Sequence, residues 1–206
     1  VLIGYAVIYI DMRMRVDEVY AIEAEPINVK YDSATIALGK KIVGVRVCAD
    51  CHGDDFGGKI LHEDAMIGRV SSRNITKGTG GLPENYSEAD WVLALKHGVG
   101  KDGKPLLFMP ANEFTQMSEP DIAAIIAYMS TVPNVDRQDL PVKPGPLAYI
   151  LGEFDVIPLI PAEKVDHTSP FAKHVEPGVN IGYGKYLAVV CTNCHGPELK
   201  GNGPLV

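Results

Sequence analysis

The sequence has only four cysteines and no long apolar or basic run, and each shortage narrows the possible functions. All four cysteines fall in two C-x-x-C-H motifs, so none is left over for a structural disulfide. A net charge of −7 argues against a nucleic-acid partner, because binding phosphates requires a basic surface. The lack of lysine or arginine runs also argues against a polybasic membrane patch.

The two motifs predict covalently bound haem. In C-x-x-C-H each thiol adds to a haem vinyl group to form a thioether, and the adjacent histidine supplies an imidazole ligand to the iron. The surrounding sequence repeats as well, with Gly-Lys before each motif and glycines at matching positions after it. The sequence therefore predicts two haems c with iron, held by Cys48, Cys51 and His52, and by Cys191, Cys194 and His195.

Two other uses of paired cysteines fit less well. The pairs lie about 140 residues apart, far beyond the spacing of a compact zinc ribbon. A thioredoxin-like redox pair requires a βαβ setting, and the sequence shows no such pattern.

The sixth ligand of the first haem is expected after His52 in the chain, and methionine and histidine are the candidates. Met109 fits best, because it lies on a loop between two expected helices and the adjacent Pro110 stiffens that loop. Other side chains are given weaker roles. Met66, Met117, Met129 and His97 remain rival ligands; Arg69, Arg73 and Asn74 are candidates to bind haem propionates, and Trp91 to pack on the haem edge; His62, His167 and His174 are expected to be solvated.

The hydrophobic pattern predicts a mainly α protein. Helices are expected over residues 34–47, 87–98 and 118–132, the last two starting with capping boxes at Ser87 and Ser118. Residues 53–81 read as loop, 147–151 as a short helix and 184–190 as the approach to the second motif. Four parts are predicted: an anchor tail and tether (1–30), a first haem domain (31–135), a proline-containing linker (136–176) and the start of a second haem domain (177–206).

The first ten residues are apolar and uncharged, but a bilayer span needs about 20 such residues. We interpret them as the tail of a longer membrane anchor; a leftover signal-peptide core and a buried strand are the alternatives. Haem attachment to such motifs predicts domains on the periplasmic side of a bacterial cytoplasmic membrane, although Arg13 and Arg15 argue mildly against an outside location for that end. Only eleven residues follow His195, so the second domain is expected to be truncated or completed by something else.

Several longer segments resemble a known family. The segments GKKIVGVRVCADCHG, RNITKGTGGL, YSEADWVLALKHGVGKDGKPLLFMP and MSEPDIAAIIAYMSTVPNVDRQDLP are similar to the membrane-anchored dihaem cytochromes c of bacteria, among them the cytochrome subunits of membrane-bound alcohol and gluconate dehydrogenases. The resemblance implies tandem domains of the class I cytochrome c fold with histidine/methionine ligation, and Met109 as the distal ligand. It also implies a second methionine beyond the sequence given, which leaves the distal ligand of the second haem open.

These features predict an electron carrier rather than an enzyme. Iron with six ligands has no open position for substrate, which favours electron transfer. Electrons would come from a quinol-linked complex or a periplasmic dehydrogenase and pass to a soluble cytochrome, an oxidase or a photosynthetic reaction centre. The alternatives are a dihaem peroxidase that uses an open second haem, and a structural redox subunit of a larger respiratory or photosynthetic complex.

Overall fold

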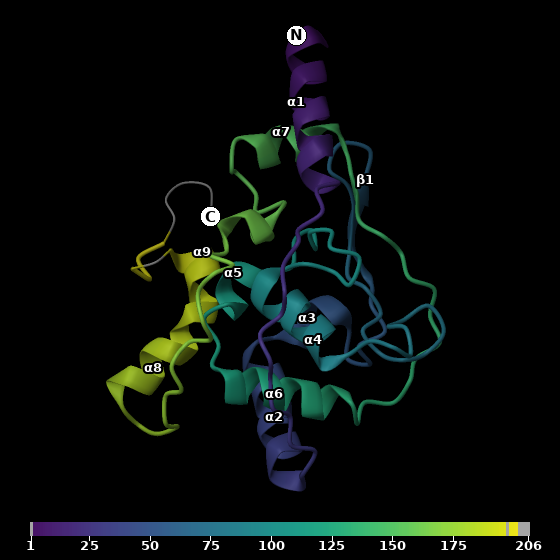
Figure 1. The fold of residues 1–206 in the computed structure, drawn as a ribbon. Helices are drawn as coiled ribbons and strands as arrows, with labels where there is room; N and C mark the ends of the chain where they lie inside the picture. The colour runs from purple at the N-terminus through teal and green to yellow at the C-terminus, as the bar shows by residue number, and fades with distance from the viewer. Residues whose placement is uncertain (1, 197, 202–206) are drawn as a thin grey trace.

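The computed structural model describes residues 2–196 and 198–201, apart from the side chains of residues 193 and 194. Helices dominate and one small sheet lies at the side (Figure 1). The first half of the described chain holds α1 (Leu2–Val16), α2 (Ser33–Val45), α3 (Cys48–His52), β1 (Ile60–Asp64), β2 (Gly68–Ser71), α4 (Glu88–Val92) and the π-helix η1 (Leu93–His97). The second half holds α5 (Ala111–Phe114), α6 (Glu119–Met129), β3 (Lys143–Pro144), α7 (Pro146–Glu153), the 3-10 helices η2 (Pro161–Lys164) and η3 (Val189–Cys191), α8 (Ile181–Ala188) and α9 (Thr192–His195).

The main core forms where α2 crosses α6. Gly39 permits the close approach, because a Cβ at this position would lie 1.9 Å from the carbonyl oxygen of Ala124. The core is filled by apolar side chains from α2, α4, η1, α5 and α6 and the loops between them: Val43, Phe56, Val92, Leu95, Phe114, Met117, Ile122, Ile125, Ile126 and Met129. Both helices were predicted, but α2 ends two residues early, because Val47 adopts a left-handed backbone conformation at φ 50°.

The two predicted capping boxes have different outcomes. At Ser87 the box is confirmed: the Ser87 side chain accepts from the Asp90 backbone N–H, and the Asp90 carboxylate accepts from the Ser87 backbone N–H at 2.7 Å. At Ser118 the prediction is wrong, because the hydroxyl makes no capping bond and Asp121 accepts a hydrogen bond from Tyr186 instead.

Residues 53–81 are more ordered than predicted. Strands β1 and β2 form an antiparallel hairpin, and β3 joins it from much later in the chain, giving the order β1-β2-β3. The hairpin was missed because β1 is exposed along its whole length and so carries no alternation of apolar and polar residues.

A second core cluster joins α1 to the segment around α7. Met12 is fully buried there, and Tyr9 packs edge-on against Tyr149 with ring centroids 5.4 Å apart. Arg15 forms ion pairs with Glu153 and Glu163 at 3.0 and 2.6 Å. Helix α1 has 15 residues, and none of the helices within the described residues is both long and apolar enough to cross a bilayer.

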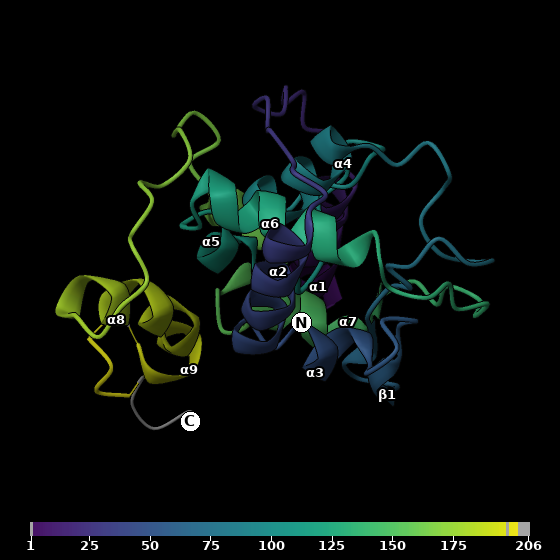
Figure 2. The same cartoon turned by 90° about the horizontal axis from the view of Figure 1, so that it is seen from below.

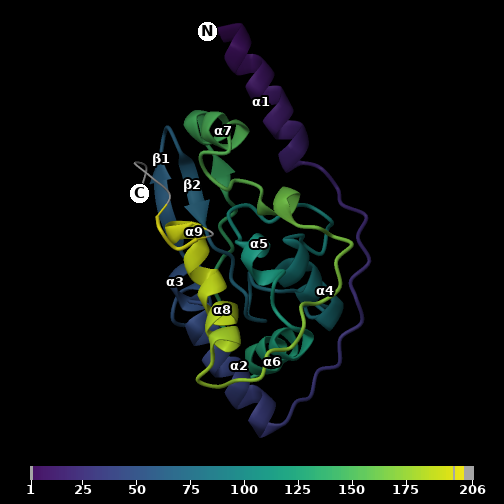
Figure 3. The same ribbon diagram turned by 90° about the vertical axis from the view of Figure 1, so that its left-hand side faces the viewer.

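The segments expected to be tether and linker lie against the rest of the fold. Residues 17–32 run the length of the molecule from α1 to α2 (Figure 3) and bond to it on the way, for example from the Tyr31 hydroxyl to Glu88 at 2.7 Å. We call residues 17–32 the N-terminal strap. Residues 136–176 supply β3, α7 and η2, so this stretch is folded structure rather than an extended spacer.

Candidate haem site

The first C-x-x-C-H motif forms a single helical turn, α3, directly after the left-handed Val47. This turn places Cys48 and Cys51 one above the other on the same face, as residues three apart on a helix are. Both cysteines are free thiols; Cys48 packs against the main core and Cys51 is exposed. Burial raises the pKa of Cys48 to about 11 and raises that of Cys51 as well. A catalytic redox dithiol requires a lowered pKa, so the local environment argues against that use.

His52 has the hydrogen bond that an iron ligand needs. Its Nδ1 lies 2.8 Å from the carbonyl oxygen of Arg73. A carbonyl only accepts, so Nδ1 carries the proton and Nε2 keeps a free lone pair. Burial also lowers the pKa of His52, which keeps the ring neutral near pH 7. The ring is therefore held in the tautomer that binds a metal through Nε2.

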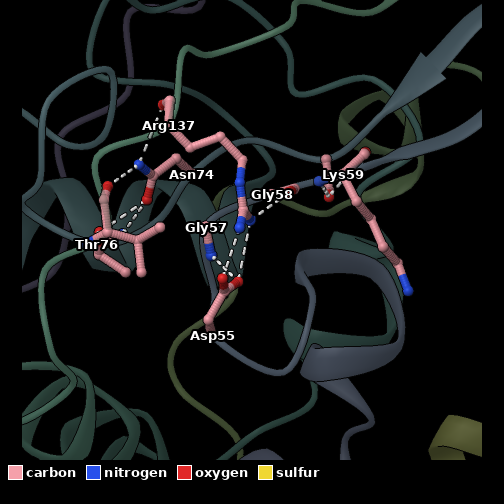
Figure 4. Close-up of polar contacts among 9 residues, drawn as sticks. Asp55, Gly57, Gly58, Lys59, Asn74, Thr76 and Arg137 are labelled. Carbon is pink, nitrogen blue, oxygen red and sulfur yellow. Dashed lines mark hydrogen bonds and ion pairs between the residues drawn. The ribbon is translucent and has the colours of Figure 1, made fainter.

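A network of polar contacts holds the Arg73 carbonyl in place. Asn74, only 2% exposed, donates to the carbonyl of Val135 at 2.7 Å and accepts from the backbone and hydroxyl of Thr76. Figure 4 shows the Arg137 guanidinium extending from the same region to the Asp55 carboxylate and the Gly58 carbonyl, at 2.7 and 3.0 Å. The network ties the loop after α3 and the strand end before Asn74 to residues 135–137.

Met109 lies on the loop before α5 and packs against the same core cluster as Cys48. The rival methionines are placed differently. Met117 and Met129 are 0% and 7% exposed within the core itself, and Met66 is 56% exposed at the turn of the β1–β2 hairpin. This distribution favours Met109 as the distal ligand, which stays a prediction.

Several side chains with a predicted haem role have protein partners in the structure. The His97 ring is fully buried, with Nε2 3.0 Å from Glu25 and Nδ1 3.1 Å from His167, so neither nitrogen is available to iron. Arg69 pairs with Glu63 and Arg73 with Asp139, at 2.8 and 2.9 Å. Asn74 serves the backbone network described above. Trp91 is partly buried against the main core, with its ring edge-on to Tyr86.

The other histidines divide in the same way. His62 is exposed and pairs with Asp64, and His174 is exposed beside Glu176, as expected of solvated side chains. His167 was also expected to be solvated, which is wrong. Its ring packs on His97 and its Nε2 is buried.

The second motif repeats the backbone of the first. After each motif a glycine N–H bonds back into the helical turn, from Gly53 to Ala49 and from Gly196 to Thr192, both at 2.8 Å. Three residues further, Phe56 and Leu199 both have φ 57°. Then the Gly58 N–H donates to the His52 carbonyl at 2.8 Å, as the Gly201 N–H does to that of His195 at 2.7 Å. The two motifs thus share a local fold as well as a sequence.

The second site is less enclosed than the first. Cys191 and His195 are both exposed, and the side chain of Cys194, predicted to form a thioether, lies outside the described part of the structure. Within residues 2–196 and 198–201, the His195 ring makes no hydrogen bond to a carbonyl oxygen like the one between His52 and Arg73.

The donors around α3 fit a covalent haem: two free thiols on one helical face, a neutral imidazole with its Nε2 lone pair free, and a thioether on the same core cluster. Comparison with known families agrees, because residues 36–133 match the family Cytochrome c. This part of the chain is a cytochrome c domain. Its family binds haem c covalently.

Known relatives are dehydrogenase subunits. The chain is 30% identical over 179 residues to the cytochrome c subunit of a quinone alcohol dehydrogenase from Gluconacetobacter polyoxogenes, covering 81% of this chain and 37% of that protein. It is 29% identical over 183 residues to the cytochrome c subunit of gluconate 2-dehydrogenase from Pantoea cypripedii, covering 81% and 39%. The resemblance found in the sequence is therefore confirmed for a cytochrome c domain and for homology to such subunits. This chain spans well under half the length of these relatives.

Sequence reasoning missed the residues that brace the site from a distance. Glu25, Lys96 and Arg137 carried no motif. Their side-chain partners lie far away in the chain, from 71 residues between Lys96 and Glu25 to 82 between Arg137 and Asp55. Lys96 and His97 are adjacent and both fully buried, and the sequence had pointed to His97 only as a rival haem ligand.

Proposed function

We propose that this protein is a membrane-tethered dihaem c-type cytochrome that carries electrons from a dehydrogenase to a downstream acceptor on the periplasmic side of a bacterial cytoplasmic membrane. The observation that carries the proposal is the bond between His52 Nδ1 and the Arg73 carbonyl, within a cytochrome c domain. It prepares Nε2 as an iron ligand directly beside two free thiols.

Each residue of the site then has one task. Cys48 and Cys51 would attach the haem through thioethers, and His52 and Met109 would supply its iron ligands. The bound haem supplies reversible one-electron chemistry at iron. If His52 and Met109 both bind the iron, no position would be left for substrate, which would suit a carrier rather than a catalyst.

The proposal of a second haem draws support from the repeated backbone. Matching hydrogen bonds and φ angles after the two motifs give Cys191 and His195 the local setting of Cys48 and His52. The dehydrogenase donor is proposed from the names of the relatives, each of which is a cytochrome subunit of such an enzyme. The membrane tether is proposed from the apolar first ten residues.

Spectroscopy and mass spectrometry of the full chain test the function. We expect the mass of two covalent haems, and of one in a Cys191→Ser, Cys194→Ser double variant. The oxidised protein should show the weak band near the red end of the spectrum that reports iron bound to methionine sulfur. Met109→Ala should abolish this band at the first haem, and Met66→Ala, at the exposed hairpin turn, should leave it intact.

Carbon monoxide binding distinguishes an electron carrier from a peroxidase. The dithionite-reduced first haem should not bind carbon monoxide until Met109 is removed. Strong carbon monoxide binding by the intact protein, together with peroxide turnover, would show that an iron has an open coordination position. The protein would then be an enzyme rather than an electron carrier. For the tether, the full-length protein should remain with the membrane fraction through a high-salt wash, and release into the supernatant would refute that part.

A further inference from the structure

Tyr186 on α8 connects the helix that leads into the second motif with the first haem domain. Its hydroxyl donates a hydrogen bond to the Asp121 carboxylate and accepts one from the Ser118 backbone N–H at 3.1 Å. Both partners lie at the start of α6, where Ser118 is fully buried and Asp121 is 9% exposed. Burial and the nearby Asp121 raise the pKa of Tyr186, so the hydroxyl keeps its proton for the carboxylate. This bond occupies the carboxylate that the sequence predicted for a capping box.

The Tyr186 ring also contacts a cationic side chain, Arg46. The Arg46 guanidinium carbon lies 5.5 Å from the ring centroid, a distance typical of a cation–π contact. Arg46 is only 3% exposed and its Nη1 makes no hydrogen bond within the described structure. Its charge also acts on buried Glu113, whose pKa is raised to about 7 by burial and lowered in part by Arg46. A buried arginine with so few bonds depends on the ring for stabilisation.

The two side chains in this contact lie close in sequence to the two haem motifs. Arg46 lies two positions before Cys48, and Tyr186 lies five positions before Cys191. The chain that leads to α8 is fixed at the same place, because Ala172 forms a parallel backbone bridge with Ser118. Figure 2 shows α8 and α9 beside the α2–α5–α6 side of the domain, rather than on an extended arm.

We propose that Tyr186 is a positioning residue that seats the second haem motif against the first haem domain, by bonding to Asp121 and stacking on Arg46. The inference rests on the proposed second haem for its use in electron transfer, since a fixed arrangement of two haems keeps transfer within one chain. The position of α8 depends only on contacts between protein side chains, so it can be tested separately from the presence of a second haem.

Amide hydrogen exchange on the full-length holoprotein tests the seating. Tyr186→Phe removes one hydroxyl and keeps the ring. We expect α8 amides to exchange about 10- to 100-fold faster, as the loss of one charge-assisted buried hydrogen bond implies. Tyr183→Phe is the matched control: it removes a hydroxyl from the same helix and keeps the ring that stacks 6.3 Å from Tyr186. It should exchange like the unaltered protein.

A double variant identifies the partner. Asp121→Ala should speed exchange in α8 as Tyr186→Phe does, and the combination should be no faster than the faster single change, because both remove the same bond. Arg46→Lys should also speed exchange, because the ammonium lacks the flat face that stacks on the ring. Unchanged protection of α8 in Tyr186→Phe would overturn the seating. A single haem by mass, with α8 still loosened, would refute the dihaem function and leave the seating established.

Discussion

The rings of His97 and His167, seventy positions apart in the chain, are in direct contact, with their Nδ1 atoms 3.1 Å apart. Since one nitrogen must donate and the other accept, only one of the two facing atoms carries a proton. Around them lie Glu25 and Lys96, the Tyr20 ring and Asp166. The pair therefore joins the N-terminal strap, η1 and the segment after η2 in one partly buried polar cluster.

Acidification should loosen this cluster. Burial and the neighbouring His97 lower the pKa of His167 below its ordinary value of 6.5. The unfolded chain then binds more protons than the folded one below about pH 6.5, so the contribution of His167 to stability falls as the pH drops through that region. Glu113 has the opposite effect: because its pKa is raised from 4.5 to about 7, its contribution to stability rises as the pH falls between these values. The effect of His167 must therefore be measured as a difference between the unaltered protein and a His167 variant.

Urea unfolding of the unaltered protein and of His167→Gln between about pH 7.5 and 5.5 measures that difference. The unfolding free energy of the variant should fall less over this range. Parallel slopes in the two proteins would exclude His167 as the titrating group.

Lys96 should matter more than an ordinary surface lysine. It is fully buried, and its ammonium donates to Glu25 and to the Ser169 carbonyl. Lys96→Ala leaves the Glu25 carboxylate without its main partner, and breaking such a pair costs about 3 kcal/mol or more. Lys104→Ala, which removes an exposed pair with Asp17 at 3.1 Å, should cost about 0–1 kcal/mol. Calorimetry gives both values, and limited proteolysis should find new cuts in the N-terminal strap of Lys96→Ala alone.

Two glycines of α2 should respond in opposite directions to alanine. At Gly39 a methyl group meets the Ala124 carbonyl oxygen at 1.9 Å, so Gly39→Ala forces α2 and α6 apart and should cost about 3 kcal/mol or more. At Gly44 the same methyl group meets nothing within 4 Å, so Gly44→Ala should add up to about 1 kcal/mol through helix propensity. Thermal unfolding compares the two. A Gly39→Ala variant as stable as the parent would contradict the packing described for the main core.

Asn74 should prove structural rather than a haem propionate ligand. Asn74→Ala removes its bonds to Thr76 and Val135 and should cost about 2–3 kcal/mol. Because the Arg73 carbonyl then loses its support, the reduction potential of the first haem should shift as well. Asn134→Ala, at an exposed position nearby, should change neither quantity. A change in potential without a loss of stability would instead favour direct contact with the haem.

Local chemistry made part of this protein readable from its sequence. The C-x-x-C-H motifs, the helices over α2 and α6 and the Ser87 capping box depend on neighbours within a few residues, so spacing alone predicts them. Met109 was chosen for the same local reason, its place on a proline-stiffened loop.

The tertiary structure decided what depends on distant partners. No spacing rule assigns Asp121 to Tyr186 rather than to its own helix cap, or brings the Arg73 carbonyl to His52. The same holds for His97, which a residue seventy positions away turns from a rival ligand into part of a buried cluster. A buried polar group must find a partner wherever the fold supplies one, and only the folded chain shows which partner that is.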